Sequence, residues 1–266
     1  MNIKVLVSTM NNTDPLELYN NMNLNTSAVI VNQCNREDII HYKSNQNSIE
    51  YINSIDRGLS KSRNKALEHA CIDDICMIAD DDMTYVNDYS HIVEKAFRDH
   101  QEYDVLVFQV EGINDTFKKY SKNARQIGYL TSLKISSVEM AIKVKSIKEH
   151  NIKFNELFGA GAEYKMGEEN IFLFKCINKG LKIKYLPLKI ADLYIGDSTW
   201  FSGFNKKYFF DKGAVFYEMT KKMNFLLILQ FAIRKYKVYR KNISFCEAMK
   251  SMNNGKNEYI RALNKK

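Results

Sequence analysis

Short apolar runs recur along the first two thirds of the chain, with segments of helical periodicity between them. Residues 3–7, 28–31, 75–79, 105–110 and 182–186 each have the length of a buried strand. Strands of parallel sheets read as near-continuous apolar runs, and strands separated by helical segments are typical of βαβ units. The pattern therefore predicts an α/β fold with a mostly parallel sheet flanked by helices.

Polar residues mark where helices are expected to begin. Asp14 followed by Pro15 has the form of an N-cap and a first-turn proline. Ser60 or Ser62 can cap a helix that runs to about Ala70.

Glycine and proline mark where other elements are expected to end. Residues 167–180 have the pattern of a helix with two acids in its first turn and Gly180 just past its end. The strand over residues 182–186 is expected to stop at Pro187. Residues 128–135 have the pattern of irregular sheet.

Polar side chains follow three of the apolar runs. Thr9, Asn32 and Asp80 lie at these ends, and Asp81 and Asp82 extend the last of them into three consecutive carboxylates. The carboxyl ends of parallel strands meet at one sheet edge, so these groups are expected to converge there. Three like charges repel unless a cation neutralises them, and Mg²⁺ or Mn²⁺ prefers such oxygens. A solvated acidic turn is the alternative.

A basic loop lies between the second and third of these strands. Residues 57–67 (RGLSKSRNKAL) place one glycine and several cations at the start of a predicted helix. Cations beside a helix N-terminus can hold a diphosphate. A solvated basic helix face is the alternative.

Length and composition limit the class of protein. A chain of 266 residues, 45% hydrophobic, can build one large α/β domain or a domain with an appendage. No apolar stretch reaches the ~18 residues needed to cross a bilayer, and the start MNIKVLVSTM has the pattern of a core strand instead of a signal peptide. The five cysteines have neither CxxC nor zinc spacing. These features predict a cytoplasmic protein.

The positive charge is concentrated at the end of the chain. The net charge is +8, while residues 201–266 hold fifteen Lys or Arg and four acids. The apolar run 223–233 leads directly into the cations and tyrosines of 234–241, so segment 219–241 is expected to lie on anionic lipid at a membrane surface. The alternative is a helix packed on the main domain with its cations solvated. The tail has no recognisable nucleic-acid module, and nucleic acid is not expected as a partner.

Four motifs in a fixed order carry a family resemblance. An apolar first strand is followed by GLSKSRNKAL (58–67), IADDDM (78–83) and FGAGAEYKMGEENIFLFKCINKGLKIKYLP (158–187). This order resembles glycosyltransferase family 2, over residues 3–210, and is most similar to bacterial members that build capsular and other surface polysaccharides. Segment 197–204 is also similar.

The resemblance implies how the chain is organised. The family has the GT-A fold, a Rossmann-like α/β architecture, and its members invert the anomeric configuration. Residues 1–212 are then the catalytic domain, and residues 213–266 are a basic helical C-terminal extension.

The resemblance also implies a donor site. Asp80-Asp81-Asp82 matches the family's D-x-D, with Asp82 as the direct ligand of Mn²⁺ or Mg²⁺. Asp80 contacts the ribose or metal-bound water, and Asp81 contributes to donor binding. Arg63 and Asn64 match an "RN" element near the nucleotide and its phosphates.

The resemblance also implies which residues bind the nucleobase of the donor and which residue is the catalytic base. Thr9 and Asn32 fall where the family grips the base, although many relatives have Asp at the position of Asn32. Glu168-Glu169 matches an acid pair whose second member is the usual catalytic base. That member is commonly Asp, so the extra methylene leaves open whether Glu168 or Glu169 is the base. Acids that serve only the helix dipole are the alternative.

The function that the resemblance implies is transfer of a sugar from a nucleoside-diphosphate donor, UDP by default, to a hydroxyl of a growing surface polysaccharide. The acceptor is then a lipid-diphosphate-linked saccharide, and the enzyme lies in the cytoplasm or on the inner face of the cell membrane. Two alternatives remain open at this point. One is a non-catalytic protein that binds nucleic acid or anionic lipid. The other is a metal-dependent nucleotidyltransferase that uses Asp80–Asp82.

Overall fold

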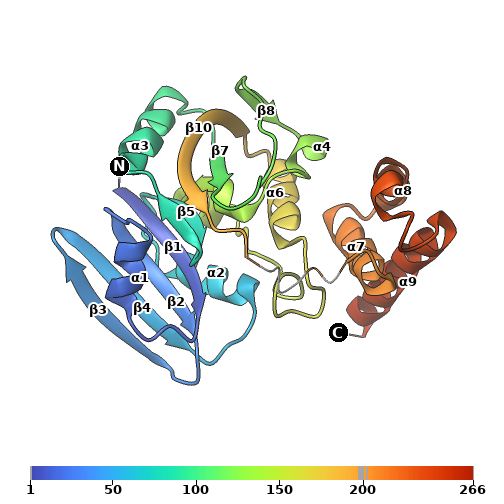
Figure 1. Ribbon diagram of the computed structural model, residues 1–266, viewed down its shortest axis with the longest axis horizontal. Coiled ribbons are helices and arrows are strands. Elements are labelled where there is room, and N and C mark those ends of the chain that lie inside the picture. Colours follow the sequence, from blue (N-terminus) through green and yellow to red (C-terminus); the bar gives the residue numbers. More distant parts are fainter. Residues whose placement is uncertain (1, 197–200, 202, 266) are drawn as a thin grey trace.

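The computed structural model describes residues 2–196, 201 and 203–265. Among these, the strands form one sheet in the order β3-β4-β2-β1-β5-β9-β7-β10-β6, with β8 paired to β10 (Figure 1). Strands β4, β2, β1, β5, β7 and β10 share one direction, and β3, β6, β8 and β9 oppose it. The mixed, mostly parallel α/β sheet predicted from the sequence is confirmed.

The strands are β1 (Asn2–Met10), β2 (Ser27–Gln33), β3 (Asp38–Ser44), β4 (Asn47–Ser54), β5 (Asp74–Asp80), β6 (Met83–Tyr85), β7 (Val105–Gly112), β8 (Arg125–Ile127), β9 (Met140–Lys143) and β10 (Ile183–Leu193). The helices are α1 (Pro15–Asn21), α2 (Leu59–Glu68), α3 (Tyr89–Asp99), α4 (Tyr129–Ser132), α5 (Val144–Glu149), α6 (Glu168–Asn178), α7 (Lys206–Met219), α8 (Asn224–Tyr239) and α9 (Phe245–Asn264).

Apolar side chains cover both faces of the sheet. On β1, Val5 and Val7 point into a core shared with α1 and α3, while Leu6 points into a core shared with α2, α5 and α6. Both sets are buried because helices lie on each side of the sheet. This explains why the strand sequences are continuous apolar runs and do not alternate.

Strand β10 continues past Pro187 to Leu193, so the predicted stop at Pro187 is wrong. Its pairing register with β7 shifts between Tyr185 and Lys189. A proline lacks the N–H that a regular ladder needs, but it fits at a bulge, where a ladder bond is not required. The expected irregular sheet at 128–135 is also wrong, because α4 occupies residues 129–132 of that segment.

Helix α2 begins at Leu59, two residues earlier than a Ser60 cap would give and four residues earlier than a Ser62 cap. Gly58 is its N-cap, with a backbone φ of +121° that favours glycine. The hydroxyls of Ser60 and Ser62 bond elsewhere: Ser60 Oγ donates to the Phe158 carbonyl at 2.7 Å, and Ser62 Oγ lies 2.9 Å from Ser8 Oγ. The two serines therefore hold α2 against the loop before α6 and against β1.

Helices α7, α8 and α9 form a separate group beside the sheet, here called the helical unit (Figure 1). Their apolar side chains share a core with Phe158, Ile171 and Phe174, which belong to the glycine-rich loop and to α6. The expected boundary between residues 212 and 213 falls inside α7. The helical unit begins at Lys206.

Two glycines allow α7 and α9 to cross in close contact. A Cβ added at Gly213 would overlap the Met252 carbonyl oxygen, and one added at Gly255 would overlap the Phe210 carbonyl oxygen. A larger residue at either position would have to push the helices apart.

In the described part of the chain, no helix is both long and apolar enough to cross a bilayer. Of the motif segment 197–204, residues 197–200 and 202 lie outside the described residues.

Candidate active site

The polar ends of β1, β2 and β5 meet at one edge of the sheet, as predicted. Thr9 pairs in register with Asn32, and Ser8 pairs with Asp80. The Thr9 hydroxyl donates to Asp81 Oδ2 at 2.5 Å and so joins the first strand to the aspartate run. Parallel strands place their carboxyl ends together, which is the common position of a ligand site in such sheets.

Asn32 is buried and its amide is engaged inside the protein. Its Oδ1 accepts from the Asn12 backbone N–H at 2.9 Å, and its Nδ2 donates to the Asn12 carbonyl at 3.0 Å and to Asn53 Oδ1 at 2.8 Å. These bonds fix the loop after β1. In this arrangement Asn32 shapes the edge of the site through that loop.

Arg63 joins three elements at the centre of the site. Its side chain is 1% exposed, and it donates through Nη1 to Glu168 Oε1 at 2.8 Å and through Nη2 to Asp80 Oδ1 at 3.0 Å. Arginine presents a fixed fork of donors, so this pairing sets the relative positions of α2, β5 and α6. We call Asp80, Glu168 and Glu169 with Arg63 the acid cluster.

Asn64, the next residue, holds the loop that precedes α6. Its Oδ1 accepts from the Phe154 backbone N–H at 2.9 Å, and its Nδ2 donates to the Phe154 carbonyl at 3.0 Å. Gly159, with a φ of +108°, lies so close to Glu168 that an added Cβ would come within 3.1 Å of its Cδ. The "RN" element therefore holds Glu168 directly through Arg63 and, through Asn64, fixes the start of the loop that leads to the acid pair.

The two glutamates of the acid pair have different surroundings. Glu168 is buried and is bonded to Arg63. Glu169 is half-buried, and its side chain forms no ion pair and no hydrogen bond to another of the described residues. Burial, followed by the charge of Glu168, raises the pKa of Glu169 to about 8. An unengaged carboxylate with a pKa near the operating pH has the properties of a general base.

Helix α7 of the helical unit approaches the start of α6. A Cβ added at Gly167 would lie 2.7 Å from Val215 Cγ1, so only glycine allows this contact. Burial lowers the pKa of Lys212, and the charges of Glu169 and then Glu168 act against this shift. Three aromatic rings lie within 6.0 Å of the Lys212 Nζ: Tyr208, Phe216 and Phe231.

Lys212 could not be recognised as a site residue from the sequence. It is one of the many cations of the tail, and nothing in the local sequence separates this lysine from the others. Its place beside Glu169 depends on how α7 packs against α6.

Asp82 is the member of the aspartate run that has no bond to Arg63 or Thr9. The Asp82 side chain reaches solvent but is partly desolvated by the protein around it. This desolvation, followed by the charges of Asp80 and Asp81, raises the pKa of Asp82 to about 6. A divalent cation would relieve this repulsion. In the described ranges, no group of three or more His, Cys, Asp or Glu side chains is arranged to hold a metal. The residues present fit a cation that takes most of its ligands from a bound substrate and water.

Comparisons with known proteins bear on the fold. No protein-family model matches the chain, and no curated protein matches it. Among solved structures, residues 1–349 of S. aureus TarS in complex with UDP-GlcNAc superpose with a TM-score of 0.68 at 18% identity, covering 98% of this chain and 81% of that one. A second crystal structure of residues 1–349 of S. aureus TarS gives a TM-score of 0.61 at 16% identity, covering 98% of this chain and 92% of that one.

A longer structure of S. aureus TarS also matches, with a TM-score of 0.61 at 16% identity; the match covers 91% of this chain and 45% of that one. At these identities the likeness concerns the fold. The chain therefore has the α/β, GT-A-like fold that the sequence predicted, with a basic helical C-terminal part.

Proposed function

We propose that the chain is an inverting glycosyltransferase that moves a sugar from a nucleoside-diphosphate donor to a hydroxyl of a surface polysaccharide. The observation that carries the proposal is Glu169, an unengaged carboxylate with a raised pKa beside the Arg63–Glu168 pair. The fold shared with TarS, a protein solved with UDP-GlcNAc, supports a nucleotide-sugar donor with UDP as its nucleotide.

Glu169 is the base in this proposal, and Glu168 is a positioning residue. The Glu169 carboxylate takes the proton of an acceptor hydroxyl as that oxygen attacks the anomeric carbon, opposite the leaving diphosphate. Glu168 cannot turn to the acceptor without leaving Arg63, its 2.8 Å partner. A single displacement inverts the anomeric configuration, and general-base help contributes roughly 10²–10⁴-fold to its rate.

The proposal includes a divalent cation, Mn²⁺ or Mg²⁺, held by Asp82 with Asp80 nearby. When bound there, the metal supplies a Lewis acid that stabilises the charge of the leaving diphosphate. Thr9 keeps Asp81 turned toward β1 through their 2.5 Å bond, which leaves Asp82 to face the donor. Exhaustive EDTA treatment should abolish turnover, and Mn²⁺ should restore it. Full activity after EDTA would remove this role from Asp82.

The reaction class can be tested by its products. The full chain, incubated with a panel of UDP-sugars and Mn²⁺, should release UDP in amounts that depend on the donor. Pyrophosphate released from a nucleoside triphosphate would instead identify a nucleotidyltransferase that uses the same three aspartates. If neither product forms, although UDP raises the melting temperature, the chain is a nucleotide-binding protein without transferase activity.

We also propose that the protein is cytoplasmic and docks on anionic lipid through segment 219–241, close to a lipid-diphosphate-linked acceptor. Four exposed apolar side chains, at positions 225, 226, 233 and 236, share one face of α8 by helical periodicity, and the sequence places Lys222, Lys237 and Arg240 near them. The exposed fractions of these side chains are 53% for Phe225, 53% for Leu226, 62% for Ile233 and 41% for Tyr236.

Liposome sedimentation tests this docking. The chain should sediment with vesicles that contain an anionic phospholipid and should stay in solution with zwitterionic vesicles. The double variant Leu226→Ser/Ile233→Ser should lose sedimentation. Ile72→Ser, which removes a 49% exposed apolar side chain far from α8 in the sequence, should not. If the wild-type protein does not bind anionic vesicles at low salt, the cations of α8 are simply solvated and the helix does not dock on lipid.

A further inference from the structure

Two exposed apolar side chains stand at the carboxyl ends of the neighbouring strands β7 and β10. Ile113 directly follows β7 and is 62% exposed, and Tyr194 directly follows β10 and is 57% exposed. Both strands run in the direction of β5, so these ends lie at the sheet edge that carries the aspartate run. Apolar side chains that are exposed singly are common, whereas neighbouring ones at the rim of a site mark a ligand surface.

The backbone places Tyr194 opposite Asp82. Leu193 pairs with Met83 in the antiparallel ladder between β10 and β6, and both side chains are buried in the core on the side of α1 and α3. The Tyr194 N–H continues this ladder by donating to the Asp82 carbonyl at 3.0 Å. Opposite residues of such a pair share a face, with Cβ atoms about 4.5–5.5 Å apart, and successive pairs alternate between faces. Tyr194 and Asp82 therefore point to the other face, which is covered by α2 and α6.

Ile113 stands on the other side of Tyr194. Strands β7 and β10 pair in parallel, with Gly112 opposite Leu193. The Ile113 N–H donates to the Leu193 carbonyl at 3.0 Å, which continues this parallel ladder and sets Ile113 beside Tyr194. Residues in register share a face, so Ile113, Tyr194 and Asp82 form a row at the ends of β7, β10 and β6. We call Ile113 and Tyr194 the apolar platform.

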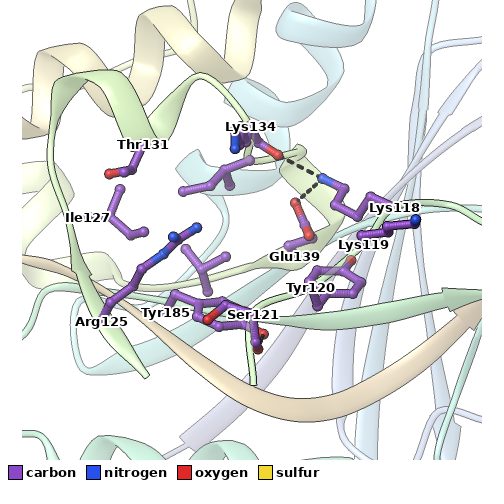
Figure 2. Close-up of a pocket in the computed structure, with 12 residues that line it drawn as sticks. Lys118, Lys119, Tyr120, Ser121, Arg125, Ile127, Thr131, Lys134, Glu139 and Tyr185 are labelled. Atoms are coloured by element: carbon purple, nitrogen blue, oxygen red, sulfur yellow. Dashed lines mark hydrogen bonds and ion pairs between the residues drawn. The ribbon is translucent and has the colours of Figure 1, made fainter. Parts of the chain in front are cut away.

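Side-chain bonds hold the apolar platform and the segment behind it in place. The Asn114 amide replaces a further ladder pair, because its Nδ2 donates to the Ile195 carbonyl at 2.7 Å and its Oδ1 accepts from the Ile195 N–H at 2.8 Å. Figure 2 shows the far end of the same segment, where Lys118 Nζ lies 2.7 Å from Glu139 Oε2 and donates to the Lys134 carbonyl at 2.9 Å. The platform is thus fixed before a ligand binds, which reduces the entropic cost of binding.

A hollow of about 430 Å³ adjoins the apolar platform. It is lined by residues 110–118 and Tyr120, so Ile113 belongs to its wall. Its volume falls in the range of small-molecule sites. Asp115 and Thr116 add polar groups to the same wall. A ring that rests on the platform has room there for polar substituents.

We propose that the apolar platform binds the sugar ring of the donor. In the proposed function Asp82 lies at the donor's diphosphate, and the sugar is bonded directly to that diphosphate. A donor bound at Asp82 therefore brings its pyranose ring next to Tyr194. One face of such a ring carries mostly C–H groups, which pack on an aromatic side chain and exclude water. The inference rests on the proposed function for its ligand, and it assigns Tyr194 and Ile113 as residues that determine which donor sugar is accepted.

Sugar binding can be measured without turnover. UDP, UDP-glucose and UDP-N-acetylglucosamine are titrated separately into the full chain by calorimetry, with saturating Mn²⁺. Tyr194→Ser should bind the preferred UDP-sugar about tenfold more weakly and UDP as wild type does, because only the sugar loses its apolar contact. Tyr194→Phe keeps the ring and should bind both ligands as wild type does. Ile113→Ser should weaken UDP-sugar binding by a smaller factor.

The control variant and the melting temperature separate a lost contact from a damaged fold. Ile72→Ser removes an exposed apolar side chain before the amino end of β5, at the opposite edge of the sheet, and should bind every ligand as wild type does. An equal loss of affinity for UDP and for the UDP-sugar in Tyr194→Ser would overturn the proposal. An equal loss of UDP-sugar affinity in Tyr194→Phe would assign the effect to the hydroxyl and would also overturn it. A wild type that binds UDP but neither UDP-sugar has no sugar platform.

Steady-state kinetics separate the donor sugar from the acceptor. With a saccharide acceptor, Tyr194→Ser should raise the donor KM about tenfold and leave the acceptor KM unchanged. An increase confined to the acceptor KM would place the acceptor on the platform and overturn its assignment to the donor. If wild type binds a UDP-sugar in a manner that depends on Tyr194 but releases no UDP, the proposed function fails and the platform stands.

Discussion

The acid cluster and the helical unit are held together in different ways. In the acid cluster, buried charges are fixed by specific pairs: Arg63 bonds to Glu168 and to Asp80. In the helical unit, aromatic side chains fill the core. Gly213 and Gly255 let the backbones of α7 and α9 come into direct contact. A charge in the first region therefore needs its partner, whereas a position in the second needs mainly the right volume. Single substitutions should separate these two kinds of stabilisation.

The largest effect is expected at Glu169, the acid of the cluster that pairs with no cation in the described part of the chain. Glu169→Gln keeps the shape of the side chain but cannot take a proton, so kcat should fall roughly 10²–10⁴-fold while binding of the UDP-sugar stays unchanged. Steady-state kinetics and calorimetry measure the two quantities. Glu163→Gln, in the exposed loop before α6, should behave as wild type. Turnover at the wild-type rate in Glu169→Gln would exclude Glu169 as the base.

Removing the centre of the acid cluster should mainly affect stability. Arg63→Met leaves Glu168 buried without its partner, and loss of one member of a buried pair costs about 3–5 kcal/mol in free energy of unfolding. Arg98→Met is the control, because the Arg98–Glu94 pair is exposed and such pairs contribute about 1 kcal/mol or less. Urea denaturation compares the two. Equal losses in both variants would mean that Arg63 does not hold the cluster together.

The raised pKa of Glu169 predicts how activity depends on pH. Burial and the charge of Glu168 raise this pKa to about 8, so the carboxyl is protonated in most molecules at pH 6. A base must be ionised, and kcat/KM should therefore rise roughly tenfold per pH unit up to about pH 8 and then level off.

The same raised pKa makes the stability of the folded protein depend on pH. The folded protein keeps a proton that the unfolded chain releases at its ordinary pKa of 4.5. The contribution of Glu169 to stability is thus fully present below that value and is lost as the pH rises through about 8. A flat kcat/KM profile between about pH 6 and pH 8 would contradict the shifted pKa.

A smaller loss is expected when the helical unit is overpacked. Gly255→Ala adds a methyl group that overlaps the Phe210 carbonyl, and such overpacking costs about 1–3 kcal/mol in free energy of unfolding. Asn254→Ala removes the carboxamide of an exposed side chain on α9, leaves an alanine methyl there, and should change stability by no more than about 0.7 kcal/mol. Thermal or urea unfolding of both variants makes the test. A Gly255→Ala protein as stable as Asn254→Ala would show that the crossing has room to adjust.

The smallest effect is expected where the two regions meet. Lys212 lowers the pKa of Glu169 by attraction, so Lys212→Met should shift the rising part of the kcat/KM profile to higher pH by less than about one unit. Activity at pH 7 should fall only a few-fold. Lys206→Met, at a 77% exposed side chain of the same helix, should leave the profile in place. A shift to lower pH would mean that Lys212 does not act on Glu169 through its charge.

Local signals in the sequence were enough for much of the fold. Asp14 caps α1 as expected, accepting from the Leu16 and Glu17 N–H groups at 3.0 and 2.9 Å, because a cap depends only on residues a few positions away. The convergence of Thr9 and Asn32 followed from strand direction alone. The predicted strand end at Pro187 was wrong. Whether a proline ends a strand depends on the register of the neighbouring strand, and the local sequence does not contain that register.

The candidate site was less predictable for a similar reason. The acid pair and the aspartate run stand out as motifs, but the partner of each acid is set by contacts over long separations, such as the 105 residues between Arg63 and Glu168. Lys212 looks like the other surface cations in the sequence. Its significance depends on the packing of α7 on α6.

The shared core of Phe158, Ile171 and Phe174 with α7–α9 has a practical consequence for expression. A shortened protein that stops before residue 206 would keep every strand but would expose aromatic rings that the missing helices normally shield from water. Exposed apolar surface of this kind promotes aggregation. Fragments intended for crystallisation or engineering should therefore retain all three terminal helices.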